Sequence, residues 1–170
     1  MNERPTPEDL AVIQNQLGRT PRDVHAISYR CPCGKPAVVA TPPRLSDGTP
    51  FPTFYYATCP KLTGAISTLE TTGMMAEMQE RLGTDKDLAV SYQKAHEQYQ
   101  AARNELGMDV PEVKGITAGG MPDRVKCLHS LVAHSLSAGP GVNPLGDEAL
   151  AALPKWWLND SCEAITEESK

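Results

Sequence analysis

The chain has 170 residues and a formal net charge of −5 at pH 7, with 16 Lys and Arg against 21 Asp and Glu, so a nucleic-acid partner held through its phosphates is not expected. With 40% hydrophobic residues the chain can bury the core of one domain, which argues against wholesale disorder. No stretch approaches the ~18 consecutive apolar residues of a membrane span, so we expect no membrane contact either.

The first predicted helix covers residues 7–17. Thr6 stands where an N-cap accepts a hydrogen bond from the backbone, Pro7 fits the first helical position, and acidic residues occupy the first turn. Gly18 follows the last apolar residue of the helical pattern and is typical of a helix end.

Short strands are expected next, because the apolar period shortens to that of a strand. Residues 26–29 and 37–40 flank a turn formed by Cys31-Pro32-Cys33-Gly34. The aromatic and β-branched run at residues 53–58 predicts a third strand. We therefore expect a small antiparallel sheet within residues 25–58.

Everything beyond residue 60 follows a helical pattern. The predicted helices cover residues 62–69, 74–82, 88–106, 122–138 and 147–153. Their packing gives an α+β fold, in which a small antiparallel sheet in the N-terminal third packs against a mainly helical C-terminal two-thirds. The expected organisation is an N-terminal helix and arm (1–18), a single globular domain (19–157) and a polar tail (158–170).

Five cysteines, at positions 31, 33, 59, 127 and 162, are the residues most informative about chemistry. The residues after Met1 lack the apolar segment of a secretory signal, so we expect a cytoplasmic protein. An odd number of thiols in a reducing compartment argues against a disulfide framework. The remaining interpretations are metal ligands, reactive thiols and buried apolar side chains.

A shared cysteine and histidine site is the leading interpretation. Cys31 and Cys59 each end a predicted strand and precede a proline, and Cys-Pro recurs among iron–sulfur ligands. Cys127 and His134 are seven positions apart and share one helix face, whereas His129 could join them only near the helix end. The three cysteines, with either histidine as fourth ligand, would suit a zinc ion or an iron–sulfur cluster.

Two other interpretations of the thiols stay open. The cysteines could be core residues, since free cysteine is often buried as a small hydrophobic side chain. Cys31 and Cys33 could form a redox pair, although one residue separates them instead of the two of the usual redox motif. Cys162 lies in the predicted tail, and we expect no role for it.

A glycine-rich segment is a candidate anion-binding loop. The backbone N–H groups of Gly119 and Gly120 could converge on a phosphate or carboxylate, and Arg124 and Lys126 add positive charge. Asn143 could orient such a ligand. The spacing is not that of a Walker motif. The alternatives are that the glycines only turn the chain and that Asn143 belongs to a rigid turn and helix cap.

Several ordered motifs resemble domain-of-unknown-function family 501, in its actinobacterial form, over about residues 19–157. The motifs are Arg30-Cys31-Pro32-Cys33-Gly34-Lys35-Pro36, Asp47-Gly48-Thr49-Pro50-Phe51-Pro52-Thr53, Thr58-Cys59-Pro60, Gly119-Gly120-Met121-Pro122, Lys126-Cys127-Leu128-His129 and Asn143-Pro144-Leu145-Gly146. The resemblance implies that family motif residues fall on Cys31, Cys59, Lys126, Cys127, His129, His134, Asn143, Pro144 and Gly146. It also implies gene neighbours for septum formation, enolase and exopolyphosphatase, which suggests cell division or phosphate metabolism, and it implies no established activity.

Two functions follow as expectations. The first is a protein with a Cys/His metal or iron–sulfur site beside an anion-binding loop, which could be an enzyme acting on a small anionic substrate. The second is a non-catalytic interaction module with a division-related protein partner. In that case the cysteines are core residues, and the contact is made by the helical seam of residues 88–106 or by Trp156 and Trp157.

Overall fold

The computed structural model describes residues 2–159 and residue 162, and it confirms the predicted α+β class. The elements in chain order are α1 (Pro7–Leu17), β1 (Ala26–Arg30), β2 (Pro36–Ala40), β3 (Tyr55–Ala57), α2 (Pro60–Glu70), α3 (Met74–Thr84), α4 (Lys86–Asn104), the 3-10 helix η1 (Pro111–Val113), α5 (Leu128–Ala138) and α6 (Pro144–Ala152). Among the described residues, no helix combines the length and the apolar character that crossing a bilayer would require.

The three strands form one antiparallel sheet in the order β1-β2-β3. Every residue of the central strand β2 is buried, because its two faces are covered by different helices. The β1–β2 connection is tight: the Cys31 backbone N–H donates to the Lys35 carbonyl at 2.9 Å, and the Gly34 N–H donates to the Cys31 carbonyl at 2.8 Å. This turn therefore holds Cys31 and Cys33 at one end of the sheet.

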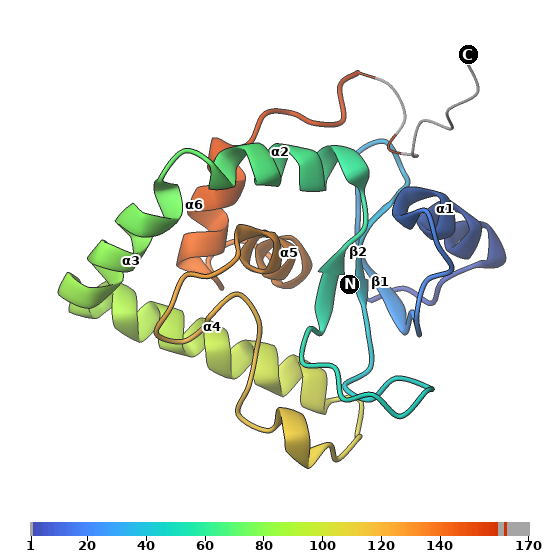
Figure 1. Ribbon diagram of the computed structural model, residues 1–170, viewed down its shortest axis with the longest axis horizontal. Coiled ribbons are helices and arrows are strands. Elements are labelled where there is room, and N and C mark those ends of the chain that lie inside the picture. The colour runs from blue at the N-terminus through green and yellow to red at the C-terminus, as the bar shows by residue number, and fades with distance from the viewer. Residues whose placement is uncertain (1, 160–161, 163–170) are drawn as a thin grey trace.

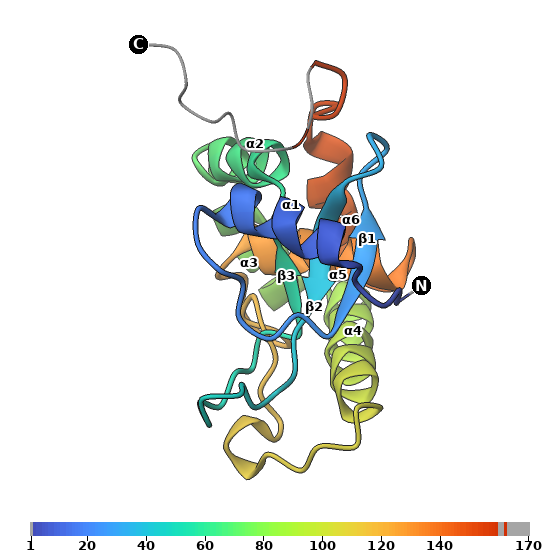
Figure 2. The same cartoon turned by 90° about the vertical axis from the view of Figure 1, so that its right-hand side faces the viewer.

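Helix α1 covers one face of the sheet and α5 covers the other (Figures 1 and 2). On the α1 side, Ile13 packs with Ile27 of β1 and Val39 of β2. On the other side, α5 is seen nearly end-on at the centre of Figure 1, framed by α2, α3, α4 and α6. A core helix enclosed in this way explains why five consecutive residues of α5, 131–135, are all buried.

An aromatic cluster joins α4 to the sheet. The backbone N–H of Phe54 donates to the Tyr99 hydroxyl at 2.6 Å, and the Tyr99 ring meets the Tyr55 ring edge-on with centroids 5.4 Å apart. The imidazole of His134 on α5 stacks on Tyr55 with centroids 5.8 Å apart. The seam predicted on residues 88–106 therefore faces the protein's own core, where Tyr99 is completely buried.

The helix predicted over residues 122–138 begins only at Leu128. The preceding segment is irregular: the Lys126 N–H donates to the Gly119 carbonyl at 2.8 Å, and the Arg124 N–H donates to the Gly120 carbonyl at 2.9 Å. Apolar residues of this loop, including Val125, are buried in the core although the loop is not helical.

The last helix begins earlier than predicted. Asn143 caps it by accepting a hydrogen bond from the Gly146 N–H at 2.9 Å, so α6 starts at Pro144 and Asp147 lies within its first turn. The predicted fraying of residues 163–170 lies outside the described residues.

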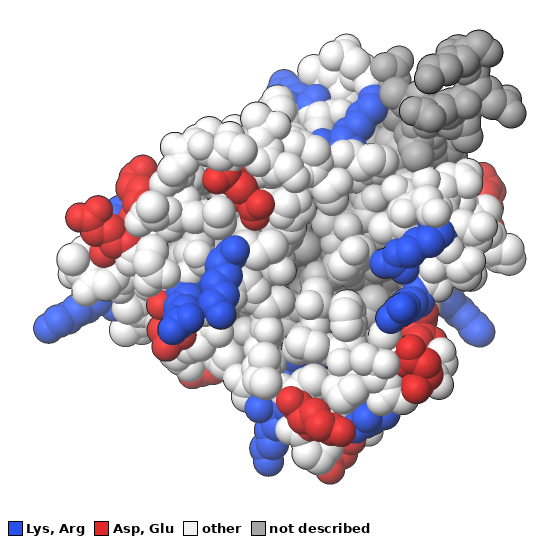
Figure 3. All heavy atoms as spheres, in the orientation of Figure 1, with Lys and Arg blue, Asp and Glu red and all other residues white. Residues whose placement is uncertain are grey.

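Charges of both signs are scattered over the face shown in Figure 3, around a broad uncharged area that is hollowed near its middle. No continuous basic surface is visible on this face.

Candidate functional site

A cluster of cysteines lies where the β1–β2 turn meets the C-terminal segment. The sulfur atoms of Cys31, Cys33 and Cys162 all lie within 4.8 Å of one another, and the Cys31 and Cys162 sulfurs are 3.3 Å apart. Cys31 and Cys162 are buried, whereas Cys33 is exposed. This cluster could hold a metal ion.

Cys59 lies near the cluster but outside the group of three sulfurs within 4.8 Å of one another. It is completely buried at the N-cap position of α2, directly after β3. Burial, together with the neighbouring thiols of Cys31, Cys33 and Cys59, raises the pKa of the Cys162 thiol. Four thiols from the β1–β2 turn, the start of α2 and the C-terminal segment therefore gather in one place.

The C-terminal segment is also held by hydrogen bonds beside the thiols. The side-chain amide of Gln16 in α1 donates to the Pro36 carbonyl at 2.8 Å and to the Cys162 carbonyl at 2.9 Å. The Lys61 ammonium at the start of α2 donates to the Asn159 carbonyl. The carbonyl of residue 162 is thereby tied to α1, and its sulfur lies against Cys31 of the β1–β2 turn.

The size of the cysteine cluster fits a single ion. A tetrahedral zinc ion with Zn–S bonds of about 2.3 Å separates its sulfur ligands by roughly 3.8 Å. The separations within the cluster, 3.3 Å for one pair and at most 4.8 Å within the group of three, bracket that value. Thiolates are also the donors that select zinc and iron–sulfur centres over hard cations.

A second group of titratable side chains lies where α5 begins. The Cys127 sulfur, a His129 ring nitrogen and a Glu70 carboxylate oxygen all lie within 4.8 Å of one another. Cys127 is the N-cap residue of α5, and Glu70 is the last residue of α2. Glu70 Oε1 accepts hydrogen bonds from the Leu128 N–H at 2.8 Å and from His129 Nδ1 at 3.2 Å, so it ties the two helices together.

The partners of His129 assign its charge. Nδ1 faces the Glu70 carboxylate at 3.2 Å, and Nε2 faces the Thr63 carbonyl, also at 3.2 Å. Both oxygens can only accept hydrogen bonds, so both ring nitrogens are assigned protons and the ring is a cation. The Cys127 thiolate raises the pKa of His129 to about 9, and Glu70 adds to this shift while burial opposes it. Without a metal, the three side chains therefore form an ion pair, and the same group could also hold a metal ion that displaces the proton.

The Cys127 thiol is shifted toward its charged form. Burial alone would raise its pKa, but the neighbouring His129 ring and hydrogen bonds from Ser130 outweigh that effect and lower the pKa. The N-terminus of α5 adds the positive end of the helix dipole. A lowered pKa, a helix N-terminus and an adjacent cationic histidine are the conditions under which cysteines become nucleophiles.

Cys127 opens onto two hollows in the surface. One, of about 440 Å³, lies between β3 and the starts of α2 and α5, and it is lined by Cys127, His129 and Thr58 among others. The other, of about 560 Å³, is lined by Cys127 together with the 115–126 loop, including Arg124 and Lys126. Both cationic side chains are exposed, and no salt bridge within residues 2–159 or to residue 162 involves them.

His134 is fixed inside the core, away from both titratable groups. Its Nε2 pairs with Gln98 Oε1 at 2.6 Å, and its Nδ1 accepts from the Asn143 amide at 3.1 Å. Burial lowers the pKa of His134 to about 4, so the ring is neutral at pH 7. Asn143 is also completely buried, and its side-chain oxygen caps α6. This is the helix-cap role that the sequence offered as the alternative to ligand binding.

The two glycines of the predicted anion loop have a packing role. A Cβ on Gly119 would come within 2.8 Å of the Leu131 side chain, and one on Gly120 within 2.7 Å of the Arg124 carbonyl. Both also have positive φ angles, 73° and 95°. The carbonyl oxygens of both glycines accept hydrogen bonds from N–H groups within the loop. Helix α5 begins at Leu128, eight residues beyond Gly120, so the two glycines do not stand at its N-terminus.

The predicted ligand set is thus distributed over different places. Cys31 and Cys59 lie in the cysteine cluster, Cys127 and His129 lie at the start of α5, and His134 lies in the core.

Sequence reasoning missed three residues. Cys33 was considered only as a redox partner of Cys31, Cys162 was assigned to the tail, and Glu70 was not considered. For Cys33 the close pairing with Cys31 was a usable signal, whereas nothing local in the sequence links Glu70 to a segment almost sixty residues later.

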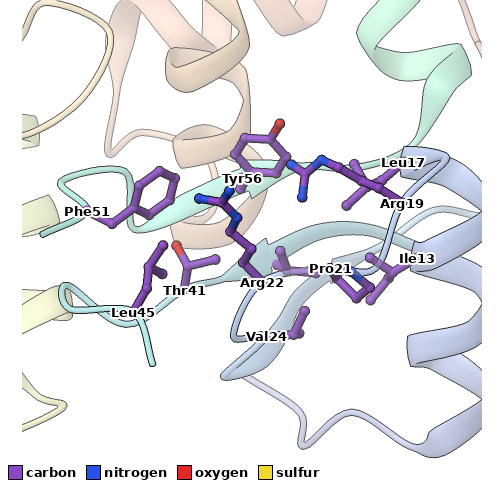
Figure 4. A pocket seen from close by; sticks show the side chains of 11 residues that line it. Ile13, Leu17, Arg19, Pro21, Arg22, Val24, Thr41, Leu45, Phe51 and Tyr56 are labelled. Carbon is purple, nitrogen blue, oxygen red and sulfur yellow. The ribbon is translucent and has the colours of Figure 1, made fainter. Parts of the chain in front are cut away.

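A further pocket, of about 340 Å³, lies on the opposite side of the sheet beside α1. Figure 4 shows the Arg19 and Arg22 side chains reaching across it toward the ring of Tyr56, above apolar side chains such as Ile13 and Val24. Its lining contains no thiol, imidazole or carboxylate.

Comparison with known proteins places the chain in a family. No curated protein and no solved structure matches it. The sequence profile of the family described as "Protein of unknown function (DUF501)" matches residues 27–151. The matched range contains the sheet except for Ala26, helices α2 to α5 and four of the five cysteines, all but Cys162. Because the match covers well over half of its length, the chain belongs to the DUF501 family of proteins of unknown function.

Proposed function

We propose that this protein binds a zinc ion through Cys31, Cys33, Cys59 and Cys162, and that the ion fastens the C-terminal segment to the sheet. The observation that carries the proposal is the convergence of three sulfurs within 4.8 Å, with the thiol of Cys59 near enough to raise the pKa of Cys162. Neighbouring thiols form only weak hydrogen bonds with one another, because S–H is a weak donor and sulfur a weak acceptor. A metal replaces these weak contacts with strong bonds.

Zinc is favoured over an iron–sulfur cluster by the spacing of the sulfurs. In a cluster several iron atoms stand between the thiolates and hold them apart, whereas one ion draws them together. The Cys31–Cys162 separation of 3.3 Å suits a single ion. Four thiolate ligands in a tetrahedron are typical of structural zinc.

The proposed ion has a structural role. Catalytic zinc keeps one position open for water or substrate, and four cysteine ligands leave none. Three of the four ligands are buried, which keeps solvent from most of the site. The proposal requires reduced thiols, so it also places the protein in the cytoplasm, where thiols are kept reduced.

The test is metal content of the protein purified without oxygen or chelators, measured by elemental analysis and by native mass spectrometry. We expect one zinc per chain in the natural sequence. Cys31→Ser and Cys162→Ser should each lose most of it, because removing one thiolate from a closed site weakens it strongly. Cys127→Ser is the matched control: it removes the one thiol outside the cluster and should keep the full zinc content.

Two results would overturn the proposal. One is substoichiometric metal of every kind together with five free thiols. The other is a protein of the natural sequence that carries a Cys31–Cys162 disulfide, seen as a mass two daltons below that of the reduced chain, roughly two hydrogen atoms. Loss of zinc in Cys127→Ser alone would move the site to the start of α5.

A further inference from the structure

We propose that Cys127 is the nucleophile of an acyl-transfer site, assisted by His129 and Glu70, and that its substrate is an ester or thioester carrying a negative charge. This activity is independent of the proposed zinc ion, which lies in a different cluster. It rests on a compact group of three side chains, on a hollow that reaches the sulfur, and on a buried hydroxyl without a partner in a residue that lines the hollow.

The first observation is the placement of the sulfur. Cys127 stands at the N-cap of α5, where the backbone leaves its first N–H groups without partners in the helix. The Ser130 hydroxyl lies 3.9 Å from the sulfur, in position to donate to it. The positive end of the helix dipole and these donors stabilise a thiolate at this point.

The second observation is the support of the imidazole. Glu70 Oε1 holds His129 Nδ1 at 3.2 Å, and the Ser67 hydroxyl and the Thr63 carbonyl hold Nε2 at 3.3 Å and 3.2 Å. A nucleophile beside a histidine, itself oriented by a carboxylate, is the general arrangement of covalent catalysis. Glu70 acts here as a positioning residue because it touches the histidine.

The third observation is a buried hydroxyl without a partner. Thr58 is 2% exposed and lines the same hollow as Cys127 and His129. Its Oγ1 makes no hydrogen bond to any part of the chain that the structure describes. A buried polar atom of this kind is usually satisfied by something, and a substrate carbonyl oxygen entering the hollow would satisfy it.

The charge of the substrate follows from the neighbouring hollow. Arg124 and Lys126 line it together with Cys127, and neither is in a salt bridge among the described residues. A carboxylate or phosphate on the substrate could therefore bind there while its acyl carbon lies at the sulfur. Other titratable groups line the two hollows besides those already named, namely Tyr55 and Tyr56 from β3 and Asp123 from the loop.

The reaction balances without any further reagent than water. The Cys127 thiolate attacks the carbonyl carbon, an S–C bond forms, and the bond to the leaving oxygen or sulfur breaks. The leaving group takes a proton from the His129 imidazolium. The neutral imidazole then removes a proton from water, the hydroxide attacks the thioester, and the acid departs as the thiolate and imidazolium are restored.

The test uses 4-nitrophenyl acetate and the negatively charged mono-4-nitrophenyl succinate with the full-length protein. We expect a burst of about one nitrophenolate per chain and a single acyl group, located on Cys127 by peptide mass spectrometry. His129→Ala should slow the burst by roughly 100-fold, the usual contribution of a general acid–base group. His25→Ala, which removes an exposed histidine, is the matched control and should leave the burst unchanged.

Further variants separate the roles of the other groups. Thr58→Val should slow acylation but leave alkylation of Cys127 by iodoacetamide unchanged, because iodoacetamide forms no oxyanion. Lys126→Ala should slow the reaction of the succinate ester about fivefold while sparing the acetate ester, as expected for one exposed ion pair. Lys114→Ala, another exposed lysine, is its control.

The role of Glu70 is tested by a pH profile. Glu70→Gln keeps the shape of the side chain but removes the charge that raises the pKa of His129, so that pKa, followed by NMR titration of the imidazole, should fall. The proposal is overturned if acyl groups appear on lysines instead of Cys127. It is also overturned if Cys127 reacts equally fast in the natural sequence and in His129→Ala.

Discussion

His129 and His134 lie on the same helix, yet their surroundings hold them in opposite charge states. The oxygens of Glu70 and Thr63 can only accept, and they face both nitrogens of His129. His134 is enclosed by apolar and aromatic groups, and the Asn143 amide donates to one of its nitrogens. The atoms that surround each ring, and not the residue type, therefore decide which histidine is charged at neutral pH.

The neutral state of His134 predicts a loss of stability in acid. Its pKa is about 4 in the folded protein against 6.5 in the absence of burial, so the unfolded chain binds the extra proton between these values. Stability should therefore fall as the pH drops from about 6.5 to 4, by up to about 3 kcal/mol from this group. Urea unfolding at a series of pH values measures the change.

The control is His134→Gln, which removes the titrating ring. This variant should be less stable at every pH, because it loses packing, but its stability should fall less steeply between pH 6.5 and 4. An equally steep fall in the variant and in the natural sequence would assign the acid sensitivity to other groups.

At the scale of elements, the contact between α5 and α6 depends on Gly146. A Cβ at this position would lie 2.3 Å from the Leu131 carbonyl oxygen and 2.4 Å from Ser135 Oγ, so the two helices would have to separate. We expect Gly146→Ala to destabilise the fold by about 1–3 kcal/mol or more. Gly64→Ala, in α2 with nothing within 4 Å of its added Cβ, is the matched control. It should stabilise the protein by up to about 1 kcal/mol, and thermal unfolding compares the two.

Local sequence signals predicted most of the elements but not where α5 starts. Thr6 and Gly18 bound α1 as expected, because capping is decided by a few adjacent residues. The predicted helix began at residue 122, whereas residues 122–127 form a loop in which Val125 is buried. Its burial comes from the irregular loop packing on α4 and α5, which no local pattern reveals.

At the scale of the whole molecule, the site depends on contacts between distant segments. The sequence predicted that Cys31 and Cys59 would share a site, since both follow strands of one small sheet. Cys162 joins them from 131 positions beyond Cys31, and only the folded chain shows that contact. The same limit explains why Cys127 was grouped with the other cysteines: in the folded chain its sulfur lies instead beside Glu70 and His129.

The proposed zinc ion would link the first and last parts of the described chain. Gln16 in α1 already bonds the backbone of β2 and of residue 162, and the metal would add four bonds at the same place. A ligand that binds only the folded state stabilises it, by about 4 kcal/mol when present at roughly 1,000 times its dissociation constant. The ion would therefore hold residue 162 against the β1–β2 turn and the start of α2.

X-ray absorption spectroscopy at the zinc edge of the purified protein tests this account most directly. We predict four sulfur neighbours at about 2.3 Å and no lighter atom in the first shell. A shell containing nitrogen or oxygen at about 2.0–2.1 Å would contradict it, because a histidine, carboxylate or water would then be a ligand in place of one of the four cysteines.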